Sequence, residues 1–366
     1  MLAPQSPGYP GNAWIGWLAY DLADAIEPGV LGRNADTSQP LAMLQRVDLS
    51  GHAPHPTAPA APPTRTVLRS HQGREAYKRS VHRALEYIRA GDVYQANIAH
   101  QFAGRYSGSP AELFAALAAS ADPVHGLGLV STHTPRQEPA APGTPAGEAI
   151  AVLSLSPELF LAYDAPTRRI TTRPMKGTRP GHADPHELRD AEKDRAELAM
   201  IVDLMRNDLG RVCEFGSVRV DDPRAIERHA SGPGAVLQAT ATVSGTVREG
   251  TTTTDILAAT FPPGSVTGTP KLRAMQIIDE LEPFARGPYC GCLGLFHDNG
   301  SFELAVAIRT VVIRGAVKPG TDAFDDALLT YCVGAGIVAD SDPESEWLET
   351  LDKAGVLNTV FDIQTD

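Results

Sequence analysis

Apolar residues in this chain recur with a helical period in some segments and in short strand-like runs in others. The clearest helical signal lies at residues 74–90, where Val81, Leu85 and Ile88 share one face. Further helices are predicted at residues 110–120, 187–208, 270–281 and 345–357. Strands are predicted at the start of residues 12–27 and at 126–130, 150–155, 159–163, 169–172, 217–220, 236–247, 305–313 and 328–333. Because the strands come as adjacent pairs, we expect an α+β fold of large, layered antiparallel β-sheets flanked by helices.

Two proline-rich stretches divide the chain. Residues 51–66 combine Pro and Ala and are predicted to form an exposed linker. We therefore expect residues 1–70 to be a separate N-terminal region and residues 71–366 to form the main domain. Residues 131–149 separate two strand-like runs and are predicted to be a disordered insertion at the tip of a hairpin.

Composition narrows the classes of function. The chain has 366 residues, 42% of them hydrophobic, and a net charge of -12, which argues against nucleic acid as its main partner. A local cluster of Arg and Lys could still bind an anionic substrate. The start lacks a secretory signal pattern and no run approaches about 18 apolar residues, so we expect a cytoplasmic protein that does not enter a membrane. Cys213, Cys290, Cys292 and Cys332 are expected to be reduced and mostly buried.

Two groups of acidic residues share predicted helix faces. Asp194 and Glu197 are three residues apart on one helix, and Glu346, Glu349 and Lys353 lie at positions i, i+3 and i+7 of the last helix. Proteins usually hold Mg²⁺ through one or two carboxylates, together with waters and substrate oxygens. The alternative is that both groups are ordinary solvated faces.

Two glycine-containing segments could lie close to a ligand. Residues 261–283 form a turn that enters a helix, and a helix N-terminus can receive an anion. The spacing of Gly264, Gly268 and Lys271 is wrong for a Walker A loop, so a plain helix start is the alternative. The glycines in residues 334–350 would allow backbone to approach a ligand closely.

Lys176 lies between Met175 and Gly177 in a predicted strand–turn region. An amine buried there could act as a nucleophile. A lysine in a turn ordinarily lies at the surface, so the residue types alone leave both readings open.

Taken together, these segments resemble the chorismate-utilising enzyme family, which includes anthranilate, aminodeoxychorismate, isochorismate and salicylate synthases. The matches occur in the family's order and cover most of residues 90–354. They are GDVYQANIAHQF (91–102), LSPELFL (155–161), TRPMKGTRP (172–180), DRAELAMIVDLMRNDLGRVCEFGSVRV (194–220), FPPGSVTGTPKLRAMQIIDELEP (261–283), RGPYCGCLGLF (286–296), AIRT (307–310) and GAGIVADSDPESEWLETLDKA (334–354). The resemblance implies an anthranilate synthase component I-like fold whose N-terminal part is truncated here.

The resemblance implies a Mg²⁺ ion bound by Glu197 and Glu349, with Asp194 and Glu346 as further candidates beside it. The metal would hold the ring carboxylate of chorismate, a dianion that also carries an enolpyruvyl ether. Glu158, in the segment SPE, matches the general acid that protonates the departing C4 hydroxyl.

Further positions match substrate contacts in the family. Arg309 and Tyr289 match residues that hold the enolpyruvyl carboxylate, a role that suits a bidentate arginine. The remaining matches to substrate-binding positions are Ser265, Thr267, the backbone at Gly334 and Gly336, and Lys353.

Two positions distinguish the members of the family. Members that add water carry a general-base lysine where this chain has Gln95, and an amide cannot take a proton from water at neutral pH. Residues 174–178 (PMKGT) resemble the motif of the aminodeoxychorismate branch, whereas anthranilate synthases usually carry a small residue at the position of Lys176. The resemblance therefore implies that Lys176 attacks C2 and that ammonia then enters at C4. The product would be 4-amino-4-deoxychorismate, a precursor of p-aminobenzoate and folate.

The resemblance also implies a partner. Ammonia is expected from glutamine through a separate glutamine amidotransferase subunit, because the chain has no amidotransferase nucleophile motif of its own. Two alternatives stay open: an anthranilate synthase component I that serves tryptophan synthesis, and a truncated, non-catalytic relative that binds chorismate.

Overall fold

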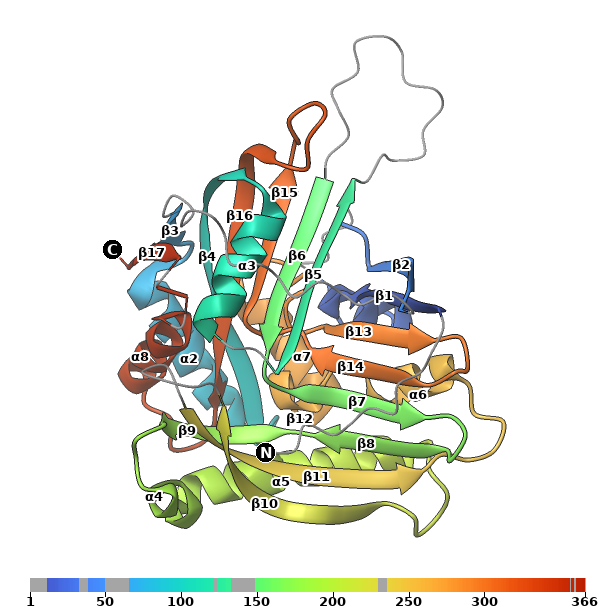
Figure 1. The fold of residues 1–366 in the computed structure, drawn as a ribbon. Coiled ribbons are helices and arrows are strands. Elements are labelled where there is room, and N and C mark those ends of the chain that lie inside the picture. Colours follow the sequence, from blue (N-terminus) through green and yellow to red (C-terminus); the bar gives the residue numbers. More distant parts are fainter. Residues whose placement is uncertain are drawn as a thin grey trace.

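The computed structural model of the protein contains two large β-sheets with helices packed on them (Figure 1). It describes residues 12–32, 39–49, 66–121, 124–132, 149–229, 236–355, 357–358 and 360–365. Nearly all of the predicted linker and of the predicted hairpin insertion lies outside these residues. The predicted class, an α+β fold with large antiparallel sheets, is confirmed.

One sheet has nine strands. In spatial order they are β10 (Arg219–His229), β11 (Val236–Thr246), β8 (Arg169–Arg173), β7 (Leu159–Asp164), β14 (Phe302–Val306), β13 (Cys292–His297), β1 (Asn12–Leu18) and β2 (Ala42–Asp48), and β9 (Met175–Pro180) pairs with β11. Figure 1 shows most of these strands running across the lower part of the molecule. They alternate in direction throughout the described register.

The other sheet has eight strands and stands upright in Figure 1. In spatial order they are β17 (Phe361–Gln364), β3 (Thr66–Ser70), β4 (Gln95–Gly108), β16 (Phe324–Ile337), β15 (Thr310–Gly315), β6 (Ala149–Ser156) and β5 (His125–Thr132), and the short β12 (Gly268–Thr269) pairs with β4. Among the described strands, only β17 and β3 pair in parallel. Strands β4 and β16 form its longest ladder.

Helices cover both sheets. They are α1 (Ala23–Ile26), α2 (Gly73–Ala90), α3 (Pro110–Ala121), α4 (Pro185–Asp190), α5 (Glu192–Gly210), α6 (Thr253–Thr260), α7 (Lys271–Leu281) and α8 (Pro343–Gly355). Helices α2, α7 and α8 pack on β4 and β16, whereas α5 packs on β9 and β11. Within the described residues, no helix combines the length and the apolar character that crossing a membrane requires. The four cysteines are buried and form no disulfide, as predicted.

Two predicted elements are corrected. The helix predicted at 187–208 is two helices, α4 and α5, because Ala191 between them is extended (φ -64°, ψ 105°). The strand predicted at 305–313 is also two strands, β14 and β15, and they belong to different sheets. Between them the chain crosses from one sheet to the other.

The two sheets meet at a seam where the chain crosses twice. It passes from β6 to β7 next to Glu158, and from β14 to β15 next to Arg309. The two crossings are hydrogen bonded to each other. Val306 N–H donates to the Glu158 carbonyl and Leu155 N–H donates to the Arg309 carbonyl, each at 3.0 Å. Two predicted site residues are thereby fixed side by side through their backbones.

A buried ion pair ties the segments around the seam together. Arg286 Nη2 lies 2.7 Å from Glu282 Oε1, and each side chain is 2% exposed. The guanidinium also donates to the carbonyls of Asn97 (2.6 Å) and Val266 (2.9 Å), and Glu282 accepts from Ala99 N–H (2.7 Å). The pair therefore joins the end of α7, strand β4 and the loop before β12. These charge-assisted bonds offset the cost of burying both ions.

We expect Arg286→Met to lower the free energy of unfolding by about 3–5 kcal/mol, because the Glu282 carboxylate would stay buried without its partner. Adding Glu282→Leu should restore part of this loss. Urea denaturation followed by tryptophan fluorescence measures both effects. Wild-type stability of Arg286→Met would show that the ion pair does not hold the seam.

Candidate active site

Glu158 lies at the centre of the candidate site. Its side chain is buried, which raises the pKa of the carboxyl to about 7, while a hydrogen bond from Ser265 and the positive charges of Lys176 and Lys353 act in the opposite direction. These three neighbours come from the loop before β12, from β9 and from α8. The fold thus brings four predicted site residues together around one carboxyl. Near neutral pH that carboxyl is poised to release a proton.

The amine of Lys176 points into the protein, against strand β16. A Cβ atom built on Gly336 would lie 2.9 Å from Lys176 Nζ and 3.1 Å from Gln95 Nε2. The side chain of Lys176 is 15% exposed, and its Nζ is 3.8 Å from Glu197 Oε2. A larger residue at position 336 would displace the amine, so the bare backbone of this glycine makes room for it. The lysine is therefore not the surface residue that its turn-like sequence suggested.

A second lysine, Lys353 of α8, also contacts strand β16. Lys353 Nζ donates to the Gly334 carbonyl (2.7 Å) and pairs with Glu349 Oε1 (2.7 Å). A Cβ on Gly334 would lie 3.0 Å from Tyr289 Oη. Gly334 and Gly336 are two residues apart on one strand and face the same side. Strand β16 thus has Lys176 and Tyr289 on the face that its two glycines present, and Lys353 on the carbonyl of Gly334.

Gln95 has a buried amide with no partner. Its side chain is 0% exposed, and neither Nε2 nor Oε1 forms a hydrogen bond to any described residue. Leaving a buried amide unpaired is costly, so such a group is typical of a site that a ligand completes. Gln95 lies next to Lys176 and Gly336, so its unpaired amide is inside the candidate site.

Arg309 is a largely buried cation in a strained backbone conformation. Its φ of 49° lies in the left-handed region that residues with a side chain rarely adopt, and such strain is common at functional sites. Burial lowers the pKa of the guanidinium, and the nearby Tyr331 acts against this. Within the described part of the chain, no hydrogen bond or ion pair engages the guanidinium. An anionic ligand would supply the missing countercharge.

The predicted metal ligands lie on α5 and α8. Asp194 is held by Arg179 at 2.8 Å, and Glu346 is buried. No three His, Cys, Asp or Glu side chains gather closely enough to hold a metal ion, as far as the described residues go. Mg²⁺ needs only one or two protein carboxylates beside water and substrate oxygens. Glu197 and Glu349 are carboxylates of the kind that Mg²⁺ prefers, and each has a lysine beside it, Lys176 at 3.8 Å and Lys353 at 2.7 Å.

The loop before β12 carries two predicted residues in different roles. Ser265 lies close enough to Glu158 to lower the pKa of its carboxyl. Thr267 is fully buried, and its hydroxyl donates to the carbonyls of Pro263 and Gly264 at 3.2 Å each. The Thr267 side chain therefore shapes the loop, and its backbone is engaged as well, because its N–H donates to the Gly264 carbonyl and its carbonyl accepts from Asn97 N–H. The buried role of Arg286, which contacts this loop, could not be predicted from the sequence. Its backbone partners on β4 and in the loop are distant in the chain and leave no local pattern.

Comparisons with known proteins agree with this arrangement. Residues 2–359 match the model of a family described as chorismate binding enzyme. Anthranilate synthase component 1 of Thermus thermophilus is 40% identical over 78% of this chain and 56% of its own length. Aminodeoxychorismate synthase component 1 of Escherichia coli is 39% identical over 78% of this chain and 57% of its own length. The chain thus spans little more than half the length of these two relatives.

A solved structure shares the fold. Anthranilate synthase component I from Streptococcus pneumoniae TIGR4 is similar with a TM-score of 0.73 and 25% identity, over 97% of this chain and 82% of that chain. The match therefore includes both sheets and the seam between them. With nearly the whole chain covered by the family model and by this fold, the protein belongs to the chorismate binding enzyme family.

Proposed function

We propose that the protein is the synthase subunit of an aminodeoxychorismate synthase, which replaces the C4 hydroxyl of chorismate with an amino group. The observation that carries this proposal is the position of the Lys176 amine, turned into the site against Gly336 and beside the unpaired amide of Gln95. Relatives named for aminodeoxychorismate and for anthranilate synthesis match at similar identity. A lysine nucleophile supports amination at C4 over direct attack at C2.

The charges of the site suit a dianion. Arg309, which lacks a countercharge among the described residues, would bind the enolpyruvyl carboxylate through its fork of N–H donors. Glu197 and Glu349 would hold Mg²⁺ near the two lysines. When bound, the metal would supply positive charge for the ring carboxylate. The amide of Gln95 would gain the hydrogen-bond partners that it lacks.

The proposed reaction is two allylic displacements. The free amine of Lys176 bonds to C2, both ring double bonds shift by one position, and the C4–O bond breaks as Glu158 donates its proton, releasing water. Ammonia then bonds to C4, both double bonds shift back, and the C2–N bond to Lys176 breaks. Glu158 takes a proton from the new ammonium group and is ready for another cycle. The net change is one hydroxyl replaced by one amino group, with one water released.

The nitrogen source in this proposal is ammonia released from glutamine by a partner amidotransferase. The subunit would then work in a heterodimer, while ammonium salt should replace the partner in vitro. The rival function is anthranilate synthesis, because a relative of that name is 40% identical to this chain.

Product identification tests the proposed function. Purified protein with chorismate, Mg²⁺ and ammonium at alkaline pH is expected to form 4-amino-4-deoxychorismate, detected by mass spectrometry and, after adding a lyase, as p-aminobenzoate. Lys176→Ala should lower this rate by at least about 100-fold, because the covalent step is lost. Lys318→Ala, at an exposed lysine, is the control and should keep the wild-type rate. Anthranilate as the product, or an unchanged rate in Lys176→Ala, would reject the proposal.

The rate should depend on the protonation of Glu158. Burial raises the pKa of this carboxyl to about 7, so its acid form persists to neutral pH and is lost as the pH rises further. At a fixed concentration of free ammonia, kcat/KM is therefore expected to decrease above pH 7. Glu158→Gln should be slower at pH 6 and should lack this decrease. The same alkaline limb in that variant would assign it to another group.

Arg309→Met separates a binding role from a structural one. The substitution removes a buried cation that has no countercharge, so thermal stability should be unchanged or higher. The Kd for chorismate, measured by calorimetry, should rise by about tenfold or more, because a charge-assisted bidentate contact is lost. A lower melting temperature with unchanged Kd would contradict the proposed role of Arg309.

A further inference from the structure

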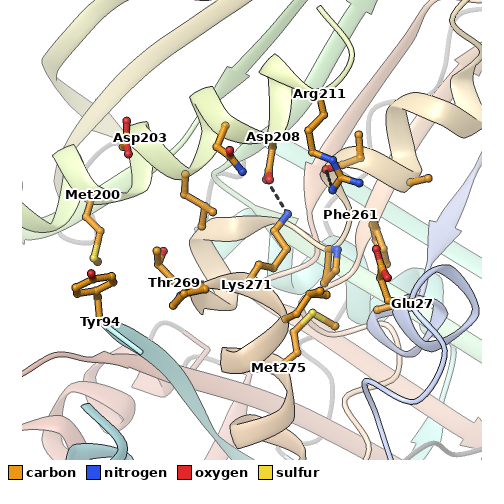
Figure 2. Close-up of a pocket in the computed structure, with 18 residues that line it drawn as sticks. Glu27, Tyr94, Met200, Asp203, Asp208, Arg211, Phe261, Thr269, Lys271 and Met275 are labelled. Carbon is orange, nitrogen blue, oxygen red and sulfur yellow. Dashed lines mark hydrogen bonds and ion pairs between the residues drawn. The ribbon is translucent and has the colours of Figure 1, made fainter. Parts of the chain in front are cut away.

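The loop at residues 261–270, which carries Ser265, is closed at its base by one buried amine. Lys271 Nζ donates to Asp208 Oδ2 (Figure 2) and to the Thr260 carbonyl, each at 2.6 Å. The side chains of Lys271 and Asp208 are 13% and 6% exposed. Burial lowers the pKa of Lys271 and raises that of Asp208, and the charge of each partner opposes the shift of the other. These contacts give Lys271 a structural role beyond that of the first residue of α7.

Three elements meet at this amine. Lys271 begins α7, Thr260 ends α6, and Asp208 lies on α5, the helix that also carries Glu197. One nitrogen therefore joins the two ends of the loop to each other and to α5. Arg211 adds a second tie between α5 and the end of α6 by donating to the Ala259 carbonyl at 3.2 Å.

The loop packs on helix α5, and Arg286 and β4 hold its other side. A side chain at Gly264 would collide with Leu204 and Met205 of α5, so the loop lies directly on that helix. Beside the ion pair, however, is a pocket of about 590 Å³ whose lining includes Met200, Leu204 and Thr269 (Figure 2). Side chains that face a pocket lack the dense packing that holds an ordinary core. At the base of the loop, where this pocket lies, the polar bonds of Lys271 therefore add to the contacts that hold the rest of the loop.

We propose that Lys271 is a positioning residue, which holds the loop so that Ser265 stays beside Glu158. The inference rests on the proposed function, since it assigns the loop's geometry to the step in which Glu158 gives its proton. Small displacements of a group that acts on the reacting atoms lower kcat steeply.

The test uses a paired substitution, because removing one member alone would leave a buried charge without its partner. Lys271→Met with Asp208→Leu replaces the ion pair by apolar side chains of similar size. We expect its melting temperature to stay within about 5 °C of wild type, and kcat for amination with ammonium to fall by about tenfold. KM for chorismate should change by less than about threefold, because Arg309 is untouched.

Ser265→Ala tests whether the paired substitution lowers kcat by displacing Ser265. In the wild-type background it should lower kcat, whereas in the paired variant it should add little, since the serine is already misplaced. Lys318→Met with Asp325→Leu, which removes an exposed ion pair on the β15–β16 connection, is the matched control and should leave kcat unchanged.

Wild-type kcat in the folded paired variant, or a fully additive effect of Ser265→Ala, would overturn the inference. Should the paired variant fail to fold, Asp208→Asn keeps an acceptor for the amine and is expected to lower kcat by about threefold. Unchanged kcat in that variant would equally overturn it. Absence of amination by the wild-type protein would instead reject the proposed function.

Discussion

The buried pair of Arg286 and Glu282 is the constraint on which the site depends. Two ions with 2% exposure are tolerable only when their hydrogen bonds are nearly all met, and here the partners are backbone groups of β4 and of the loop before β12. Those two segments carry Gln95 and Ser265. The need to hydrogen bond this buried ion pair therefore sets the spacing between the eight-stranded sheet and the loop before β12. Gln95 and Ser265 inherit that spacing.

Much of the secondary structure could be predicted from the sequence, because local patterns specify it. The apolar face formed by Val81 and Leu85 predicted α2 closely. Strand β4 escaped notice because residues 95–100 are buried on both faces and show no alternation. The run at 305–313 looked like one strand because its apolar pattern continues while the chain changes sheets. Such a crossing is decided by distant partners, which a local window does not contain.

The candidate site was predictable only through the family resemblance. Residue types and spacing left Lys176 as an ordinary turn lysine and Glu158 without a role. The fold places both near residues more than a hundred positions away in the chain, such as Gly336. Arg286 and Lys271 were not singled out for the roles described above, because a buried ion pair is visible in a sequence only when both partners are already known to meet.

The two glycines of β16 set how closely polar side chains approach this strand. Gly334 and Gly336 lie beside the amines of Lys353 and Lys176 and the hydroxyl of Tyr289. A Cβ atom at position 336 would lie 2.9 Å from the Lys176 amine, and one at position 334 would lie 3.0 Å from the Tyr289 hydroxyl. Two absent side chains thus let an amine and a hydroxyl reach the main chain of a central strand, where any other residue would keep them at a distance.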